Sequence, residues 1–282
     1  MNKLKSIFFT LSMVYWMLLS VFTLYMLYTI NINLPTIGML MVSFLPTGFI
    51  VWLNLTKKPR TSSNQTLITF TMLIGFAILI IGSVHFSFFL ISIYGISLAF
   101  WILFIFWYSH LPIQKSDILQ PGNALPELQF KTYKNEPFYC SSLLGKKVIY
   151  LFYRGNWCPV CMAQIKEITG QYKYLKELGA EMLLISPQPH NKSKELTESI
   201  GMEFLFLMDE HNEMAQKLKI EHKNGVPIGS VAMGYEDDTV LPTVIITDEH
   251  GKIIFLDQTD NFRIRPEPST FLAVLKNQST RA

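Results

Sequence analysis

The pattern of hydrophobic positions changes near residue 110. Before that point four long apolar runs follow one another, at residues 7–30, 37–53, 66–84 and 86–107. As a helix rising 1.5 Å per residue, the first run would be about 36 Å long, which exceeds a hydrocarbon core of about 30 Å. We therefore predict a transmembrane region of four helices over residues 1–110. Pro46 and Gly48 should kink the second helix, and residues 82–85 should turn the third into the fourth.

Beyond a predicted linker at residues 111–121, short apolar runs alternate with amphipathic stretches. Strands are predicted at residues 147–153, 181–186, 204–208, 243–247 and 252–256, and helices at 159–178, 192–200, 212–218 and 268–276. The sequence Asp248-Glu249-His250-Gly251 is typical of a hairpin turn between the last two strands. This order indicates an α/β domain, a mixed sheet flanked by helices, over residues 122–282.

Composition and charge support two unlike parts. Half of the 282 residues are hydrophobic and the mean hydropathy is +0.27, which is high for a chain that contacts only water. Residues 1–110 contain five basic residues and no Asp or Glu. The composition excludes a disordered chain and a disulfide-stapled mini-domain, and the polar part lacks the basic patch that would indicate a nucleic-acid partner. The four runs contain no Cys and no charged residue, so we interpret them as an anchor in the lipid bilayer, or a bundle that docks a partner, rather than a redox relay.

The short loops predict how the chain is oriented. Lys3 and Lys5 precede the first run, and Lys57, Lys58 and Arg60 lie between the second and the third. Basic loops stay on the cytoplasmic side, and an even number of spans returns the chain to that side. The α/β domain is therefore expected in the cytoplasm. The first run is not expected to be a cleaved signal peptide, because it is too long and lacks a cleavage site of small residues.

Two of the three cysteines form a C-x-x-C pair where a buried strand gives way to a helix. Cys158 is expected at the helix N-terminus, where unpaired N–H groups and the helix dipole favour a thiolate. Pro159 suits the first helical position, and Cys161 lies one turn further along the same face. A thiolate that attacks an S–S or O–O bond needs a second thiol nearby, and this spacing supplies one. The pair therefore predicts redox chemistry at Cys158 and Cys161.

Other interpretations of these residues have less support in the sequence. A structural zinc site is disfavoured because no second ligand pair accompanies the two thiols, so we expect no bound metal and no cofactor. A copper carrier would need a distal histidine such as His190 or His222. Cys140 has no partner in the sequence and is interpreted as a core or loop thiol. Arg154 could stabilise a thiolate, but an arginine at a strand end is more often solvated or ion-paired at the surface.

The chain also resembles a known family in a series of short motifs. They are Tyr153-Arg154-Gly155-Asn156-Trp157-Cys158-Pro159-Val160-Cys161, Ile185-Ser186-Pro187-Gln188, Met208-Asp209, Leu241-Pro242-Thr243 and Arg263-Ile264-Arg265-Pro266-Glu267-Pro268. In order and spacing they are similar to the peroxiredoxin-like branch of the alkyl hydroperoxide reductase/thiol-specific antioxidant family. The resemblance implies a thioredoxin-like fold, Cys158 as the attacking cysteine, and Pro242 as the cis-proline beside the active site. Trp157, Pro159, Pro242 and Arg154 are the expected supporting residues.

The chain departs from the family at two positions. Typical peroxiredoxins carry Pro and Thr or Ser seven and three residues before the attacking cysteine, whereas here these are Leu151 and Gly155. Together with the predicted membrane region, the resemblance implies a membrane-anchored antioxidant oxidoreductase. Cys158 would reduce peroxide and become a sulfenic acid, Cys161 would convert that acid into a disulfide, and an external thioredoxin- or glutathione-type thiol would reduce the disulfide. The departure keeps a protein disulfide oxidoreductase open as an alternative. A non-enzymatic copper-binding or docking module is the third hypothesis.

Overall fold

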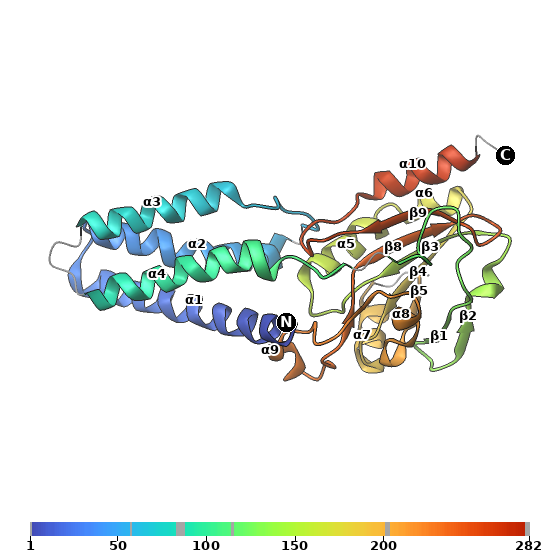
Figure 1. Cartoon of the computed structure of the whole chain (residues 1–282), viewed down its shortest axis with the longest axis horizontal. Coiled ribbons are helices and arrows are strands. Elements are labelled where there is room, and N and C mark those ends of the chain that lie inside the picture. Colours follow the sequence, from blue (N-terminus) through green and yellow to red (C-terminus); the bar gives the residue numbers. More distant parts are fainter. Residues whose placement is uncertain (1, 57, 83–87, 114–115, 201–203, 280–282) are drawn as a thin grey trace.

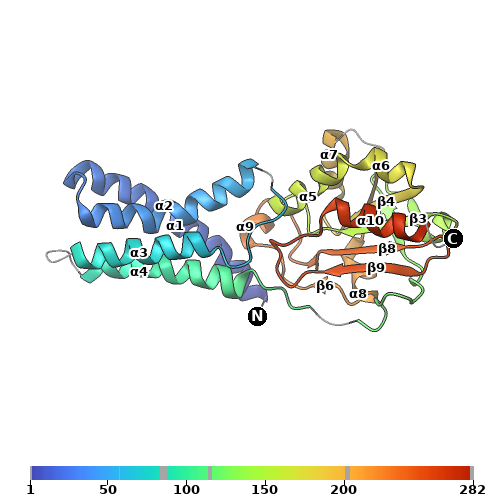
Figure 2. The ribbon, with the colours of Figure 1, turned by 90° about the horizontal axis from the view of Figure 1, so that it is seen from above.

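The computed structural model describes residues 2–56, 58–82, 88–113, 116–200 and 204–279. A bundle of long helices and an α/β domain lie end to end (Figure 1). Figure 2 shows the same arrangement from above, with the strands confined to one end of the molecule. The α/β character and the mixed sheet predicted for the second part are both confirmed.

Four apolar helices build the bundle, as the sequence pattern predicts. They are α1 (Asn2–Ile30), α2 (Leu34–Thr56), α3 (Thr66–Gly82) and α4 (Phe88–Leu103), which continues as the π-helix η1 (Phe104–Tyr108). Three of them, α1, α2 and the continuous helix over Phe88–Tyr108, are long and apolar enough to cross a membrane. The described part of α3 is apolar but shorter, with 17 residues. Most of the hairpin predicted at 82–85 lies outside the described residues.

Small side chains and internal hydroxyls hold these helices together. A Cβ added to Gly38 of α2 would lie 2.4 Å from the carbonyl oxygen of Gly75 in α3, so the two backbones meet at glycines. The Thr23 hydroxyl lies within hydrogen-bonding distance of the Tyr94 hydroxyl, at 2.8 Å, and donates to Ser43 Oγ at 3.0 Å. These bonds link α1 to α2 and α4 within an apolar setting, where a polar group without a partner would be costly.

The α/β domain is built on a seven-stranded sheet in the order β2-β1-β5-β4-β3-β8-β9. Its strands are β1 (Gln129–Thr132), β2 (Pro137–Tyr139), β3 (Lys147–Phe152), β4 (Ala180–Ser186), β5 (Leu205–Met208), β8 (Thr243–Thr247) and β9 (Ile253–Gln258). The central strands β3, β4 and β5 are parallel, whereas β1, β8 and β9 run antiparallel to their neighbours. Every residue of β3 is buried, as its apolar sequence predicts, and β8 and β9 form the expected hairpin.

Helices connect the strands near the predicted positions. They are α5 (Pro159–Thr169), α6 (Tyr172–Glu177), α7 (His190–Ile200), α8 (Glu213–Lys217), α9 (Ile228–Val231) and α10 (Pro268–Ser279), and a two-stranded ladder joins β6 (Glu221–His222) to β7 (Thr239–Val240). The single helix predicted at residues 159–178 is wrong, because α5 ends at Thr169 and α6 begins at Tyr172. Gly170, a poor helix former, occupies the C-cap of α5 and ends that helix.

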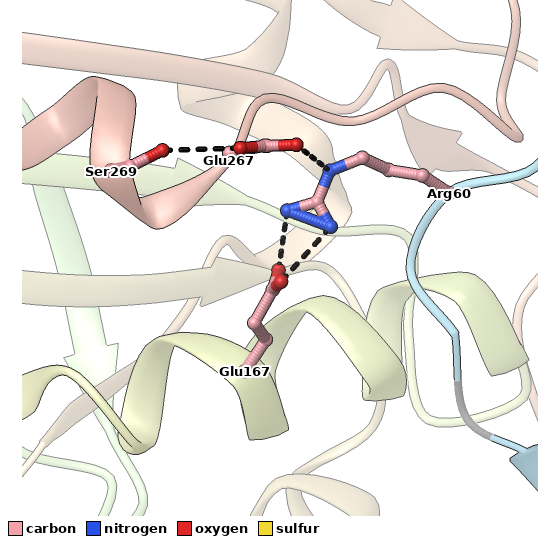
Figure 3. A network of polar contacts seen from close by, with 4 residues as sticks. All are labelled: Arg60, Glu167, Glu267 and Ser269. Carbon is pink, nitrogen blue, oxygen red and sulfur yellow. Dashed lines mark hydrogen bonds and ion pairs between the residues drawn. The ribbon is translucent and has the colours of Figure 1, made fainter.

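Two arginines fasten the domain to the bundle. Figure 3 shows Arg60, which follows α2, forming a bidentate ion pair with Glu167 of α5 at 3.1 and 2.6 Å while its Nε faces Glu267 at 4.0 Å. Arg263 is completely buried and donates to Ser109 Oγ, Thr61 Oγ1 and the carbonyl oxygens of Ser62 and Ser63. The segment after α2 and the end of the fourth helix therefore pack directly on the domain.

Candidate active site

Cys158 lies where the sequence predicts, at the start of α5. It is the N-cap residue of that helix, with extended backbone angles, and Pro159 occupies the first turn. The Cys158 N–H donates to the Gly155 carbonyl at 3.1 Å, which closes the turn between β3 and α5. The Cys158 side chain makes no hydrogen bond to the backbone of this first turn.

A tight turn before Cys158 depends on Gly155 and Gln188. Gly155 has a φ of +139°, and a Cβ there would lie 2.8 Å from the Trp157 indole nitrogen. The Asn156 N–H donates to Gln188 Oε1 at 2.8 Å, so the 185–188 motif has a structural role in holding this turn. A threonine at position 155 would fit neither this backbone angle nor this space. The conformation of the loop therefore requires the glycine that stands in place of the family's Thr or Ser.

Both sulfurs of the pair are buried and free, with Cys158 only 1% exposed. Burial, together with the hydrogen bond that it donates to Cys161, raises the pKa of Cys158. Burial also opposes ionisation of Cys161, but the bond from Cys158 and the positive charges of Arg265 and Arg154 lower the pKa of Cys161 to about 6. Within this hydrogen-bonded pair Cys158 therefore holds its proton more tightly than Cys161 does, which is the reverse of the thiolate expected at Cys158.

Two arginines contribute to this site from different elements. Arg154 is 4% exposed, so the expectation of a solvated or ion-paired strand-end arginine is wrong. Its Nη2 donates to the Gly225 carbonyl at 2.5 Å and its guanidinium lies 4.7 Å from the centre of the Trp157 ring, while its Nε has no protein partner. Arg265 places Nη2 at 4.0 Å from the Cys161 sulfur. The sequence shows only that Arg265 belongs to a motif shared with the family. It does not indicate the contact with Cys161, because the two residues lie far apart along the chain.

The structure also tests the predictions for Pro242 and Cys140. The cis-proline expected at Pro242 is wrong, because no cis peptide bond occurs in the described part of the chain. The backbone there is continuous with β8, the Leu241 N–H donates to the Ile220 carbonyl at 2.7 Å, and a trans bond is the favoured form before proline. Cys140 is buried at the start of a 3-10 helix, and burial with the nearby Glu127 raises its pKa to about 12, which agrees with an inert core thiol.

A cavity of about 190 Å³ lies over Cys158, between the domain and the bundle. The domain lines it with Arg154, Trp157, Cys158, Pro159, Val160, Pro227, Ser230 and Phe262. The bundle lines it with Phe9, Met13, Ile50, Leu53, Asn54, Phe104 and Tyr108. Most of these side chains are apolar. Cys158 contributes to the cavity wall and Cys161 does not, so Cys158 is the sulfur of the pair that faces this space.

The surroundings of His222 do not fit a metal. Within the described residues no group of three His, Cys, Asp or Glu side chains is placed to hold an ion. His222 is buried and its two ring nitrogens have no partner, but burial and the nearby charges of Arg154 and Lys5 lower its pKa to about 3. Two cations beside the ring oppose a bound copper ion as well as a proton.

Comparison with known proteins identifies relatives of the α/β part. Residues 121–256 match the AhpC/TSA family. The chain is 23% identical over 163 residues to peroxiredoxin Bcp of Bacillus subtilis, covering 58% of this chain and 99% of that one. It is 28% identical over 119 residues to the chloroplastic peroxiredoxin Q of Sedum lineare, covering 41% of this chain and 61% of that one. The crystal structure of peroxidoxin BcpB from Mycobacterium tuberculosis superposes with a TM-score of 0.48 at 18% identity, over 56% of this chain and 97% of the other.

A mixed sheet with a C-x-x-C pair at the start of the helix after a central strand defines a thiol oxidoreductase of the thioredoxin-like class. Residues 121–256 match the AhpC/TSA family, and together with the shared motifs this match makes the α/β part of the chain that of a peroxiredoxin-like oxidoreductase. The resemblance inferred from the sequence is thereby confirmed. The bundle lies outside the matched residues.

Proposed function

We propose that the protein is a membrane-anchored thiol peroxidase in which Cys158 attacks the peroxide and Cys161 resolves the product. The observation that carries this proposal is the position of Cys158. Its sulfur faces a cavity, while Cys161 lies outside the cavity wall in a hydrogen bond with it. The names of the relatives, peroxiredoxin Bcp and peroxiredoxin Q, point to the same reaction.

The shared proton explains how a buried thiol becomes a nucleophile. Cys161 holds the negative charge and takes the proton of Cys158 as that sulfur attacks the distal peroxide oxygen. The O–O bond breaks, an S–O bond forms, and the departing alkoxide or hydroxide takes the proton held by Cys161, so that Cys158 becomes a sulfenic acid and Cys161 is again a thiolate. The Cys161 thiolate then attacks the Cys158 sulfur to form a disulfide, the S–O bond breaks, and the hydroxide leaves as water with a proton from the solvent. Two thiols of an external reductant return both cysteines to the reduced state.

Peroxide consumption by the purified full-length chain in detergent, with dithiothreitol as reductant, tests this function. Cys158→Ser is expected to abolish turnover. Cys161→Ser is expected to slow the attack, because the proton acceptor is lost, and to leave the sulfenic acid that does form on Cys158 unresolved, so that dimedone would label it. Cys140→Ser is the matched control, because Cys140 is a buried thiol outside the site, and it should behave as wild type. Turnover that survives in Cys158→Ser would overturn the proposal.

The alternative of a protein disulfide oxidoreductase has less support. A folded protein substrate would have to bring its disulfide to a sulfur that is 1% exposed and covered by the bundle. Insulin reduction measured on the same preparation separates the two functions, and we expect it to be far slower than peroxide consumption. The third hypothesis, a copper-binding module, predicts stoichiometric copper on the reduced chain with neither activity, and the charges around His222 oppose it.

The proposed orientation places the domain in the cytoplasm. Asn2 bonds the Lys223 carbonyl, and Arg60 binds α5, so the N-terminus and the segment after α2 lie at the same end of the bundle as the domain. This supports the prediction that all three share one side of the membrane, where cytoplasmic thiols keep the cysteine pair reduced. A C-terminal reporter that is active only outside the cytoplasm should stay inactive. Strong reporter activity would reverse the orientation.

A further inference from the structure

The cavity over Cys158 has walls from two sources. The AhpC/TSA match covers residues 121–256 only, yet roughly half of the lining residues lie in α1, α2 and the fourth helix. These residues are far from Cys158 in sequence and reach it because Arg60 and Arg263 fasten the bundle to the domain. The bundle is therefore part of the site as well as an apolar support for it.

The chemistry of these walls selects what can enter. Phe9, Met13 and Leu53 present aromatic, thioether and aliphatic groups, and no acidic side chain lines the cavity among the described residues. An apolar cavity of about 150 Å³ can stay dry and bind benzene, so 190 Å³ accommodates an aromatic ring or a short alkyl segment. A small polar molecule gains little from such walls, because it loses its hydrogen bonds with water on entry.

Two polar side chains of the cavity wall, Arg154 and Tyr108, lie together near Cys158. The Nε of Arg154 is buried without a protein partner, and the Tyr108 side chain is close enough to Arg154 for a hydrogen bond. A donor left free at the reactive sulfur suits an oxygen of a bound peroxide. The cavity thus combines a polar end at Cys158 with apolar walls from the helices, which matches a molecule with one polar group on an apolar body.

A route for such a molecule exists on the bundle side. Asn54, near the end of α2, lines the cavity and is exposed, while Phe9 and Met13 are only partly buried. The cavity therefore reaches the surface beside helices that are apolar enough to lie in a membrane. An apolar peroxide dissolved in the bilayer would meet these side chains before it met water.

We infer that the helical bundle is the specificity-determining half of the active site, and that it selects organic hydroperoxides with an apolar body over hydrogen peroxide. The inference rests on the proposed peroxidase function and adds its substrate class. Each hydroperoxide ROOH gives the alcohol ROH and a sulfenic acid on Cys158, so the chemistry at the sulfur is the same for all peroxides. Discrimination then depends on whether the apolar body R fits between Phe9, Met13 and Leu53.

The test compares cumene hydroperoxide with hydrogen peroxide on the full-length reduced chain in lipid nanodiscs. Wild type is expected to react about tenfold faster or more with cumene hydroperoxide, as second-order rate constants. Met13→Trp fills the cavity and should lower the ratio of the cumene hydroperoxide constant to the hydrogen peroxide constant about tenfold. Met17→Trp, one turn along α1 at an exposed position, is the matched control and should change neither constant.

A second pair of variants keeps the test decisive if Met13→Trp fails to fold. Leu53→Phe intrudes on the cavity from α2, and Leu55→Phe alters an exposed position of the same helix. Equal constants for the two peroxides in wild type, or an unchanged ratio in both filling variants, would overturn the inference and leave the peroxidase function intact. Failure of the proposed peroxidase function would be recognised separately, because turnover of either peroxide would then not depend on Cys158.

Discussion

Arg60 and Glu167 form a bidentate ion pair that joins the segment after α2 to the helix carrying the redox cysteines. Glu167 lies on the same helix as Cys161, less than two turns further along the chain. The two side chains are 24% and 37% exposed, so water screens their attraction in part. The pair therefore orients the bundle on the domain, while the buried Arg263 provides the stronger attachment beside it.

Removing Glu167 should release the segment around Arg60. An ion pair with this exposure contributes up to about 1 kcal/mol, and Glu167→Gln is expected to speed tryptic cleavage after Arg60 by about two- to fivefold. Cleavage after Lys58 does not interfere, because Pro59 follows it. The control is Glu210→Gln, which breaks the exposed Lys131–Glu210 pair away from the junction and should leave cleavage unchanged. An unchanged rate in Glu167→Gln would mean that the pair does not hold this segment.

Arg263 should matter much more to stability than Arg60. Its guanidinium is fully buried and donates to the Ser62 and Ser63 carbonyls and to the buried Ser109 Oγ, so Arg263→Met removes these bonds and leaves the Ser109 oxygen without this donor. Such a loss costs about 3 kcal/mol or more, against about 1 kcal/mol for Arg60→Met. Thermal unfolding of both variants in the same detergent should therefore show the larger fall in midpoint for Arg263→Met. Arg263→Lys should recover only part of the loss, because an ammonium group cannot reproduce the forked geometry. Equal midpoints for Arg263→Met and Arg60→Met would contradict this account.

Local features of the fold followed closely from the sequence. The apolar run ending at Phe152, the proline after Cys158 and the spacing to Cys161 suffice to place a buried strand, a helix start and a thiol pair. The break between α5 and α6 was missed, because the apolar periodicity continues through Gly170 and only the cap geometry ends the helix. The short strand pair β1–β2 offers too few residues for an alternating pattern to stand out.

The composition of the site was harder to predict, because it depends on contacts between distant segments. Arg265 reaches Cys161 from a loop more than one hundred residues away, and Met13 reaches the cavity from the first helix. Hydrophobic periodicity indicates which face of a helix is buried, but it does not indicate which other segment packs against that face. The sequence therefore does not indicate that apolar side chains of α1 line a space beside Cys158.

Gly155 should tolerate no side chain. An alanine there would adopt a φ of +139° and bring its Cβ to 2.8 Å from the Trp157 ring, which itself stacks on Arg154. Gly145 also has a positive φ, +92°, but a Cβ there would meet nothing within 4 Å. Both alanine variants share the backbone strain of about 1–3 kcal/mol, so the difference between them isolates the contact with Trp157. We expect Gly155→Ala to lose most peroxide turnover and Gly145→Ala to retain it. Similar activities in the two variants would show that the turn can adjust.

The rate of reaction with peroxide should fall below pH 6, because protonated Cys161 can no longer accept the proton of Cys158. The pKa of Cys161 lies near 6, below the ordinary thiol value of 9.0, and Arg265 is one cause. A lowered thiol pKa stabilises the folded state fully above pH 9, and this contribution is lost as the pH falls through 6. Arg265→Met removes a positive charge at 4.0 Å from the sulfur, so the acidic limb of the rate profile should move upward by about one unit or more. Arg265→Lys keeps the charge and should keep the limb near its original place. The measurement is the second-order rate constant of the reduced full-length chain from pH 5 to pH 8.5. If the acidic limb of the profile stays in place in Arg265→Met, another group sets the charge of the cysteine pair.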